Sequence, residues 1–199
     1  MSLLDQTSFV VAQKTKLIEL TNEYAVRSES GEQIGGVVEV GQSWLKKIVR
    51  LLGEYDQYFT HRLSVREADG TEVLQVVRPA KIFKSRVIVS NAAGQEIGQL
   101  VQENVFGKIR FGLYAAGTQI GSLNAENWRA WDFHIQDAAG VQVARVTKTW
   151  EGFARTIFTT ADNYIVQLEA SLTDPMRSLV VAAALTIDTA LKQDSRGFN

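Results

Sequence analysis

Short apolar runs along this chain alternate with polar turns that contain glycine. In five places a glycine is followed three residues later by Ile or Val, and another aliphatic residue comes three positions after that. Two apolar residues, two positions apart, precede each turn. This order is typical of a β-hairpin. The pattern therefore predicts five hairpins, whose glycines and aliphatic residues are Gly31/Ile34, Gly70/Val73, Gly94/Ile97, Gly117/Ile120 and Gly140/Val143.

The step of three residues between the two aliphatic positions interrupts the alternation expected of a strand. Three of these steps contain a further glycine, at Gly35, Gly98 and Gly121. A β-bulge or sharp bend at these glycines would return the second aliphatic residue to the inner face. A sheet with such bulges tends to curl, and closure into a barrel removes its edges. A propeller or solenoid fits less well, because the hairpins share no consensus beyond the turn.

The C-terminal helix is predicted over residues 175–191 and is apolar on every side. Asp174 is a suitable N-cap, and Pro175 is a suitable first helical residue. A helix without a polar face lies inside lipid or protein. Its uninterrupted apolar core extends only from Leu179 to Leu185, whereas a bilayer span needs about 20 mostly apolar residues. We therefore expect the barrel to enclose this helix, within a single domain of residues 1–199.

A second helix is predicted over residues 43–55, where apolar residues recur at helical spacing between basic ones. Two interpretations are open. The apolar face caps one mouth of the barrel, or the helix lies on a membrane with its apolar residues inserted and its lysines outward. The residues at the membrane surface would be Trp44, Lys46, Lys47 and Arg50.

The composition is that of an ordinary folded protein, with 45% hydrophobic and 22% charged residues. A net charge of -1 predicts no general attraction to nucleic acid. The chain has no cysteine, which excludes disulfides, thiol catalysis, cysteine-based metal sites and palmitoyl anchors. The first residues lack the basic segment and long apolar core of a secretion signal. We therefore expect a cytoplasmic protein.

One basic stretch, residues 78–86, lies between two predicted strands and contains no acidic residue. Several cations that converge on one phosphate form charge-assisted hydrogen bonds. Each such residue contributes about 1 kcal/mol near an anionic surface. The stretch is a candidate site for anionic headgroups, and the alternative is a solvated linker. Its basic residues are Arg78, Lys81, Lys84 and Arg86.

The sequence contains no pattern that indicates catalysis. A nucleophile elbow, a phosphate loop and a dinucleotide fingerprint are all absent from it. His134 alternates with apolar residues and is expected on the polar face of its strand, beside Asp132. A buried Asp188 near the end of the helix would need a partner, such as Arg145 or Arg155. We expect a protein that is not an enzyme.

The C-terminal part of the chain resembles the phospholipid scramblases, which are related to tubby-like and plant LURP-one-related proteins. The resemblance rests on a Lys-x-Trp-x-Gly motif that begins at Lys148, on Phe158 before the Asp-Asn-Tyr motif at 162–164, and on a small-residue helix that ends in Ile187-Asp188. It extends weakly over the earlier hairpins, and the chain resembles the short, bacterial-type members. The resemblance implies a closed antiparallel barrel of about twelve strands around a central hydrophobic helix.

The resemblance also implies a function. It implies a non-enzymatic protein that binds anionic phospholipid headgroups at the cytoplasmic membrane surface, together with phospholipid scrambling. Tubby-like proteins bind phosphoinositide headgroups through basic residues on the barrel wall, so residues 78–86 are the expected contact. Attachment would be peripheral, at the inner face of the plasma membrane, with phospholipids and unidentified proteins as partners. The alternative is a soluble tubby-like scaffold or regulator that binds a protein or a small ligand.

Scramblases are described with a calcium-binding segment just before the helix, which aligns with residues 160–171 here. Asp162 and Asn163 remain, but the first and last positions, Thr160 and Ser171, are not acidic, and the sixth is not glycine. Calcium needs several oxygen ligands and a glycine for the sharp turn. We therefore expect no calcium and no other cofactor, and we interpret the segment as a core strand.

Overall fold

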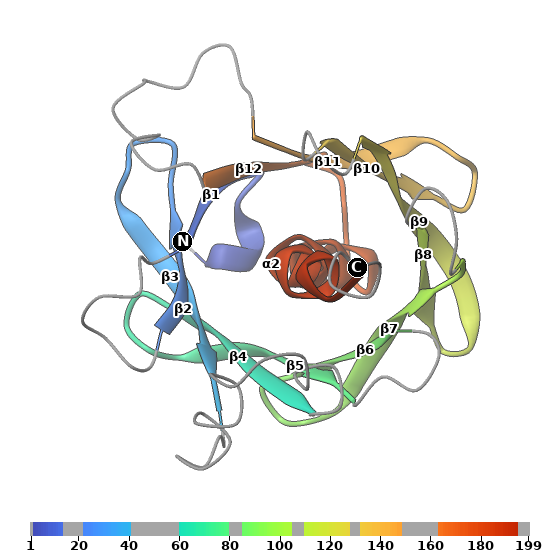
Figure 1. Cartoon of the computed structure of the whole chain (residues 1–199). Helices are drawn as coiled ribbons and strands as arrows, with labels where there is room; N and C mark the ends of the chain where they lie inside the picture. The colour runs from blue at the N-terminus through green and yellow to red at the C-terminus, as the bar shows by residue number, and fades with distance from the viewer. Residues whose placement is uncertain are drawn as a thin grey trace.

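The computed structural model describes residues 2–13, 22–40, 60–79, 85–104, 110–127, 132–148 and 163–194. Twelve strands form a closed antiparallel barrel, in which each strand pairs with the next along the chain and β1 (Ser8–Gln13) closes onto β12 (Asn163–Leu168). The helix α2 (Met176–Asp194) passes through the middle of the ring (Figure 1). The predicted fold, a mainly β barrel of twelve strands around a hydrophobic C-terminal helix, is confirmed.

The strands alternate between buried and more exposed positions, as expected where one face of a sheet packs on the core. A short 3-10 helix, η1 (Leu3–Asp5), precedes β1. The remaining strands are β2 (Asn22–Arg27), β3 (Gln33–Glu39), β4 (His61–Glu67), β5 (Glu72–Arg78), β6 (Arg86–Asn91), β7 (Glu96–Gln102), β8 (Arg110–Ala115), β9 (Thr118–Asn127), β10 (Asp132–Asp137) and β11 (Gln142–Thr147).

All five predicted hairpins are present, and the glycine of each turn has a positive φ angle between 79° and 89°. Glycine adopts this conformation without steric cost. Each hairpin also contains a bulge. The register between β6 and β7, for example, shifts after Val89, so that Ile97 is the extra residue and Gly98 takes the next inward position. In every hairpin the extra residue is the aliphatic one three positions after the turn glycine, which confirms the predicted break in alternation.

The bulge glycines let the wall approach the helix. A Cβ atom on Gly98 would lie 2.2 Å from the carbonyl oxygen of Tyr114 and 3.1 Å from Leu179 Cδ1. A Cβ atom on Gly121 would lie 2.4 Å from the carbonyl oxygen of Gln136 and 2.5 Å from Met176 Cε. Only glycine therefore fits at these two positions, between the backbone of the neighbouring strand and α2.

The middle of α2 is buried on all sides. Every residue from Leu179 to Leu185 is at most 2% exposed, and the three alanines at 182–184 keep this part of the helix narrow. Burial contributes roughly 1.5–3 kcal/mol for each large aliphatic side chain. Within the described ranges, no helix has the length and apolar character needed to cross a membrane.

The ends of α2 differ slightly from the predicted ones. The helix begins at Met176, one residue after the expected start, and extends to Asp194, beyond the expected end at Leu191. Asp174 caps the first turn as predicted, because its Oδ1 accepts hydrogen bonds from the Ser178 N–H at 3.0 Å and from the Ser178 hydroxyl at 2.7 Å.

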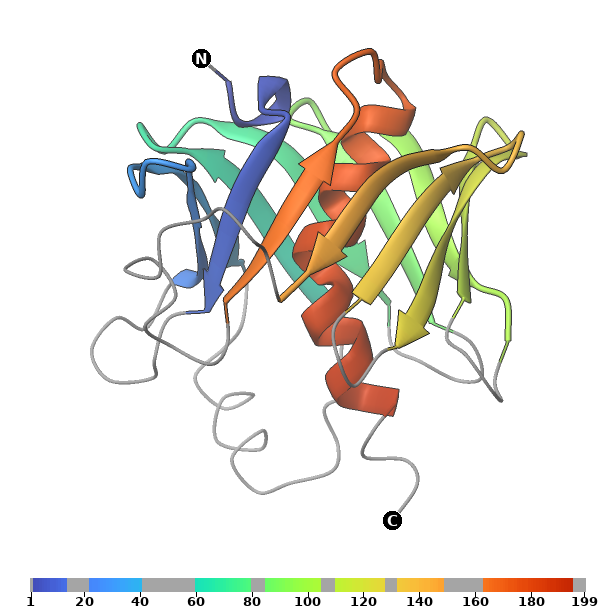
Figure 2. The same cartoon turned by 90° about the horizontal axis from the view of Figure 1, so that it is seen from above.

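The two ends of the barrel are built differently. One end, here called the turn end, carries the tight hairpin turns, η1 and the start of α2 (Figure 2). Leu3 is fully buried there, and its N–H donates to both carboxylate oxygens of Glu67 at 3.0 and 2.9 Å. Arg177 of α2 donates to the carbonyl oxygens of Leu4 and Gln6, so the N-terminal segment closes this end. The opposite end, where β5 finishes and β6 starts, is called the loop end.

Candidate functional site

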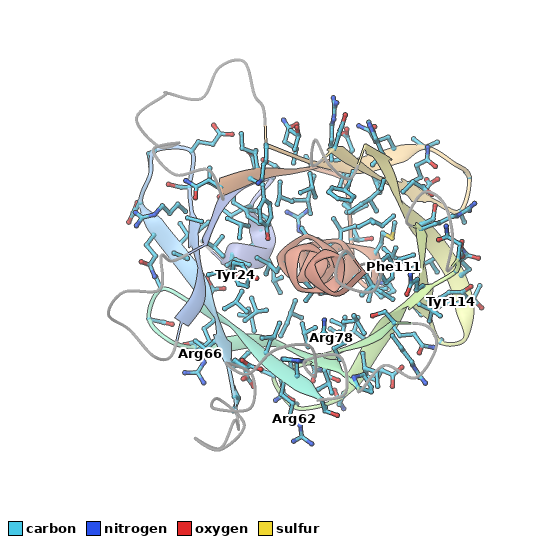
Figure 3. The ribbon with its side chains drawn as sticks, viewed as in Figure 1. Tyr24, Arg62, Arg66, Arg78, Phe111 and Tyr114 are labelled. Carbon is cyan, nitrogen blue, oxygen red and sulfur yellow. The ribbon has the colours of Figure 1, made fainter. Side chains whose placement is uncertain are left out.

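The wall of the barrel divides the basic stretch predicted from the sequence. Arg78, the last residue of β5, is 7% exposed and its side chain points toward the interior (Figure 3). Arg86, the first residue of β6, is exposed on the outer wall. Lys81 and Lys84 lie outside the described residues. Of the two described arginines, only Arg86 therefore faces the surroundings of the barrel.

Arg78 lies in a polar region inside the loop end. It is directly opposite His61 of β4, and His61 Nδ1 is 2.7 Å from Glu39 Oε1 of β3. The side chains of His61 and Glu39 are each 8% exposed. A buried charge needs a partner, and Arg78 interacts within the chain. Its guanidinium is therefore not presented to a ligand at the outer wall.

Arg62 is a second exposed arginine, which the sequence analysis did not select. The strand β4 directs Leu63 and Val65 inward, so Arg62 faces outward (Figure 3). The alternation of apolar residues along this strand is a sequence signal that locates Arg62 on the outer wall. Like Arg86, it lies in the half of the wall nearer the loop end.

Aliphatic side chains connect the two arginines across the outer wall. Arg62 lies opposite Val77 of β5, and Val77 lies opposite Ile88 of β6. Ile88 is two residues from Arg86 on the same face of β6, and it is half-buried, as is Val77. Two further valines extend this surface, one beside Arg62 and one opposite Arg86. We call it the arginine–aliphatic face, and its residues are Val40, Arg62, Val77, Arg86, Ile88 and Val101.

The positive charge of this face has no partner within the described part of the chain. The side chains of Arg62 and Arg86 form no hydrogen bond or ion pair with another described residue. The carboxylate of Glu72, also on β5, is held by hydrogen bonds from Ser64 and Gln75. The bond from Ser64 lowers the pKa of Glu72. This carboxylate is therefore bound by Ser64 and Gln75 and lies near the positive charge of Arg66.

A second carboxylate, Glu103, is turned away from the arginine–aliphatic face. It follows β7 and forms an ion pair with Arg110 of β8, with Arg110 Nε 2.7 Å from Glu103 Oε2. The Gln119 amide of β9 donates to the other carboxylate oxygen at 2.9 Å. These contacts place the charge of Glu103 toward β8 and β9, whereas the face spans β3 to β7.

A separate charged cluster lies on the opposite side of the ring, on β10 and β11. Arg145 Nε and Nη2 donate to the two carboxylate oxygens of Asp132, both at 3.0 Å. This hydrogen bonding lowers the pKa of Asp132 and raises that of Arg145. His134 lies on the same face, as predicted, with its Nε2 3.5 Å from Asp132 Oδ1. Arg145 thus binds Asp132 on the outer wall instead of the predicted Asp188; the Asp188 side chain and Arg155 lie outside the described residues.

The segment that aligns with the calcium site is largely a core strand. Asn163 opens β12, is 7% exposed and pairs with Ala12 of β1. Tyr164 and Val166 are buried, which confirms the interpretation as a strand. In the ranges that the structure covers, no group of three or more His, Cys, Asp or Glu side chains could hold a metal ion. The remaining candidate residues lie outside the described part of the chain: Asp162, Trp44, Lys46, Lys47 and Arg50.

The fold defines a class of proteins in which a twelve-stranded antiparallel barrel encloses its own C-terminal helix. The model of the scramblase family matches residues 2–191, which is nearly the whole chain. The chain therefore belongs to the scramblase family.

The chain is also similar to a curated yeast protein, altered inheritance rate of mitochondria protein 25 of Saccharomyces cerevisiae. The two are 23% identical over 214 residues, which cover 85% of this chain and 64% of the yeast protein. The chain thus spans a little less than two thirds of the length of this relative. No solved structure matches the chain.

Proposed function

We propose that this protein is a non-enzymatic, scramblase-like protein that binds anionic phospholipid headgroups at the cytoplasmic surface of a membrane. Membership of the scramblase family supports the class. The observation that carries the proposal is the arginine–aliphatic face, on which Arg62 and Arg86 are exposed without a carboxylate partner among the described residues. Guanidinium groups in this state are suited to donate hydrogen bonds to phosphate oxygens.

The spacing of the two arginines suits lipid phosphates. Arg62 and Arg86 lie on β4 and β6, which flank β5, and Arg86 is two residues from Ile88, the residue of β6 in register with Arg62. Their backbones are therefore roughly 12 Å apart at ordinary strand spacing and rise. Their long side chains can close on one headgroup or reach two neighbouring ones. Lys81 and Lys84 are in the connection from β5 to β6 and belong to the proposed contact by chain connectivity. The basic residues of the predicted 43–55 helix are proposed as a second contact.

Headgroup binding does not require α2 to leave the barrel. The residues from Leu179 to Leu185 are enclosed, and exposing them would forfeit roughly 1.5–3 kcal/mol for each large side chain. The arginine–aliphatic face, in contrast, already lies on the outer wall. The proposed mechanism is therefore electrostatic attachment of the intact barrel, and phospholipid scrambling is a separate activity that the family name suggests.

The proposal is tested by co-sedimentation of the pure protein with phosphatidylserine-containing and neutral phosphatidylcholine vesicles at low and moderate salt. We expect binding to the anionic vesicles only, weakened by salt. The double variant Arg62→Gln/Arg86→Gln should bind about 30-fold more weakly, because each basic residue contributes about 1 kcal/mol near an anionic surface.

Arg145→Gln is the matched control, since it removes the same charge from an arginine that is paired with Asp132 on the opposite side of the barrel. It should bind as the wild type does. Equal weakening by Arg145→Gln would show that only net charge matters and would overturn the assignment to this face. No binding under any condition would favour the soluble scaffold. Stronger binding with added calcium would contradict the expectation that no calcium is used.

A further inference from the structure

The arginine–aliphatic face combines charge with apolar area. Val40 is 43% exposed. Val77, Ile88 and Val101 are half-buried and alternate with core residues along their strands, so their side chains face outward. Arginines alone would suffice to attract phosphate, whereas aliphatic side chains beside them indicate a partner that also offers an apolar layer. An anionic lipid surface offers both.

The aliphatic part of this face does not continue along the strands toward the turn end. One step toward the turn end, the outward residues that follow Arg62, Val77 and Ile88 on the same strands are Ser64, Gln75 and Ser90. This next row is polar across the same three strands. On β7 the residue opposite Ile88 is the polar Gln99. The apolar area is therefore a narrow band nearer the loop end, and Val77 and Ile88 at its centre can enter an apolar layer without burying the polar row beside them.

The closed barrel limits how a partner can bind here. The backbones of β3 to β7 are each paired on both sides with neighbouring strands, so an extended peptide cannot add itself as a further strand. Contact must be made by side chains on a convex wall. A lipid surface deforms to fit such a wall, whereas a folded acidic protein would need a matching hollow.

From these observations we infer that the barrel docks on the bilayer by its side wall, with Val77 and Ile88 inserted between headgroups and Arg62 and Arg86 bound to the surrounding phosphates. This inference rests on the proposed function. It adds how the barrel is oriented on the membrane and how deeply its side chains insert. The wall of β4 to β6 faces the membrane, the axis of the barrel is oblique to the membrane, and the turn end with η1 stays in water. Insertion is shallow, as for other interfacial elements, which enter about 5–10 Å.

The absence of cysteine from the chain allows a direct test. Single variants Val77→Cys and Ile88→Cys carry an environment-sensitive fluorophore and are mixed with phosphatidylserine-containing vesicles. We expect a blue shift at both positions. Val141→Cys is the matched control, because Val141 is 60% exposed but lies in the turn between β10 and β11. Its emission should stay unchanged.

A second measurement uses unlabelled protein. The double variant Val77→Ser/Ile88→Ser should bind anionic vesicles roughly ten-fold more weakly, because the inserted apolar area is lost, while the slope of binding against salt concentration stays that of the wild type. Val141→Ser should bind as the wild type does. Circular dichroism and thermal unfolding establish that each variant is folded.

The outcomes separate this inference from the proposed function. If the wild type binds no vesicles, both fail. If the wild type binds and Arg62→Gln/Arg86→Gln weakens the binding, but the labels at 77 and 88 do not shift and the serine variants bind normally, the headgroup contact stands and side-wall insertion is overturned. A blue shift at 141 equal to that at 88 would also overturn the orientation.

Discussion

Charged side chains on the outer wall are of two kinds, and the difference has consequences for function. Asp132 and Arg145 form a bidentate ion pair. Arg62 and Arg86 have no such partner among the described residues. An exposed ion pair contributes little to stability, about 0–1 kcal/mol, but it occupies both charges. The unpaired arginines are the ones that remain available to a ligand.

At the residue scale, the stabilising effect of Asp132 should depend on pH. Its pKa is lowered, chiefly by the hydrogen bond from Arg145. A lowered pKa contributes stability above the unfolded-state value of about 3.9, and this contribution is lost as the pH falls through the folded-state value. Urea unfolding should therefore show that Asp132→Asn lowers the free energy of unfolding at pH 7 and lowers it less at pH 3.

Arg145→Gln removes the same pair from its other side and should show the same trend with pH. A difference between the wild type and Asp132→Asn that is equal at both pH values would mean that the ionised pair does not stabilise the fold.

At the scale of the elements, the bulged strands and α2 depend on each other. The bulge directs two consecutive residues inward. At Gly98 and Gly121 the backbone oxygens of Tyr114 and Gln136 on the neighbouring strands leave no room for a side chain, and α2 lies beside them. Helix and wall therefore approach closely where glycine is present. The sequence pattern predicts the bulges, but not the contacts that demand glycine, which are with the backbone oxygens of Tyr114 and Gln136 and then with Leu179 and Met176 of α2.

We expect Gly98→Ala to destabilise the protein by about 3 kcal/mol or more, since the new Cβ meets a backbone oxygen that cannot move aside easily. Gly94→Ala, in the turn of the same hairpin, is the control. Its Cβ would meet nothing, although its φ of +79° should cost about 1–2 kcal/mol. Chemical denaturation compares the two. Equal losses would mean that the backbone of β8 does not restrict the residue at position 98.

At the scale of the whole molecule, closure of the barrel encloses α2. The ring is complete because β1 pairs with β12, although these strands lie at opposite ends of the sequence. The N-terminal segment then covers the turn end through Glu67 and Arg177. A protein built in this way presents the outer face of its wall and keeps α2 inside.

Hydrogen exchange should report this enclosure. The amides from Leu179 to Leu185 should exchange only through global unfolding and therefore be among the slowest in the chain. Their exchange rates should be the same with and without bound phosphatidylserine-containing vesicles, because attachment uses the intact barrel. Faster exchange of these amides on vesicles would show that the barrel opens and would contradict attachment through the outer wall alone.

Much of the fold follows from the sequence alone, because its signals are local. A glycine with positive φ closes each turn, the aliphatic step of three residues marks each bulge, and an all-apolar helix with Asp174 as its cap has to be buried. His134 likewise falls on the polar face of β10 by simple alternation. These features depend on neighbours a few residues away and need no knowledge of the partner strands.

The placement of Arg78 required the tertiary structure. In β5 the apolar residues Val73, Leu74, Val76 and Val77 occupy both faces, so alternation does not say which way Arg78 points. The bulge at Val73 and the packing of Leu74 and Val76 in the core settle it, and Arg78 follows them inward. Strand pairing also brings Arg62 across Val77 toward Ile88 and Arg86. The local sequence pattern therefore specifies the barrel, and the register of the strands around the closed ring specifies which charged residues lie together on its surface.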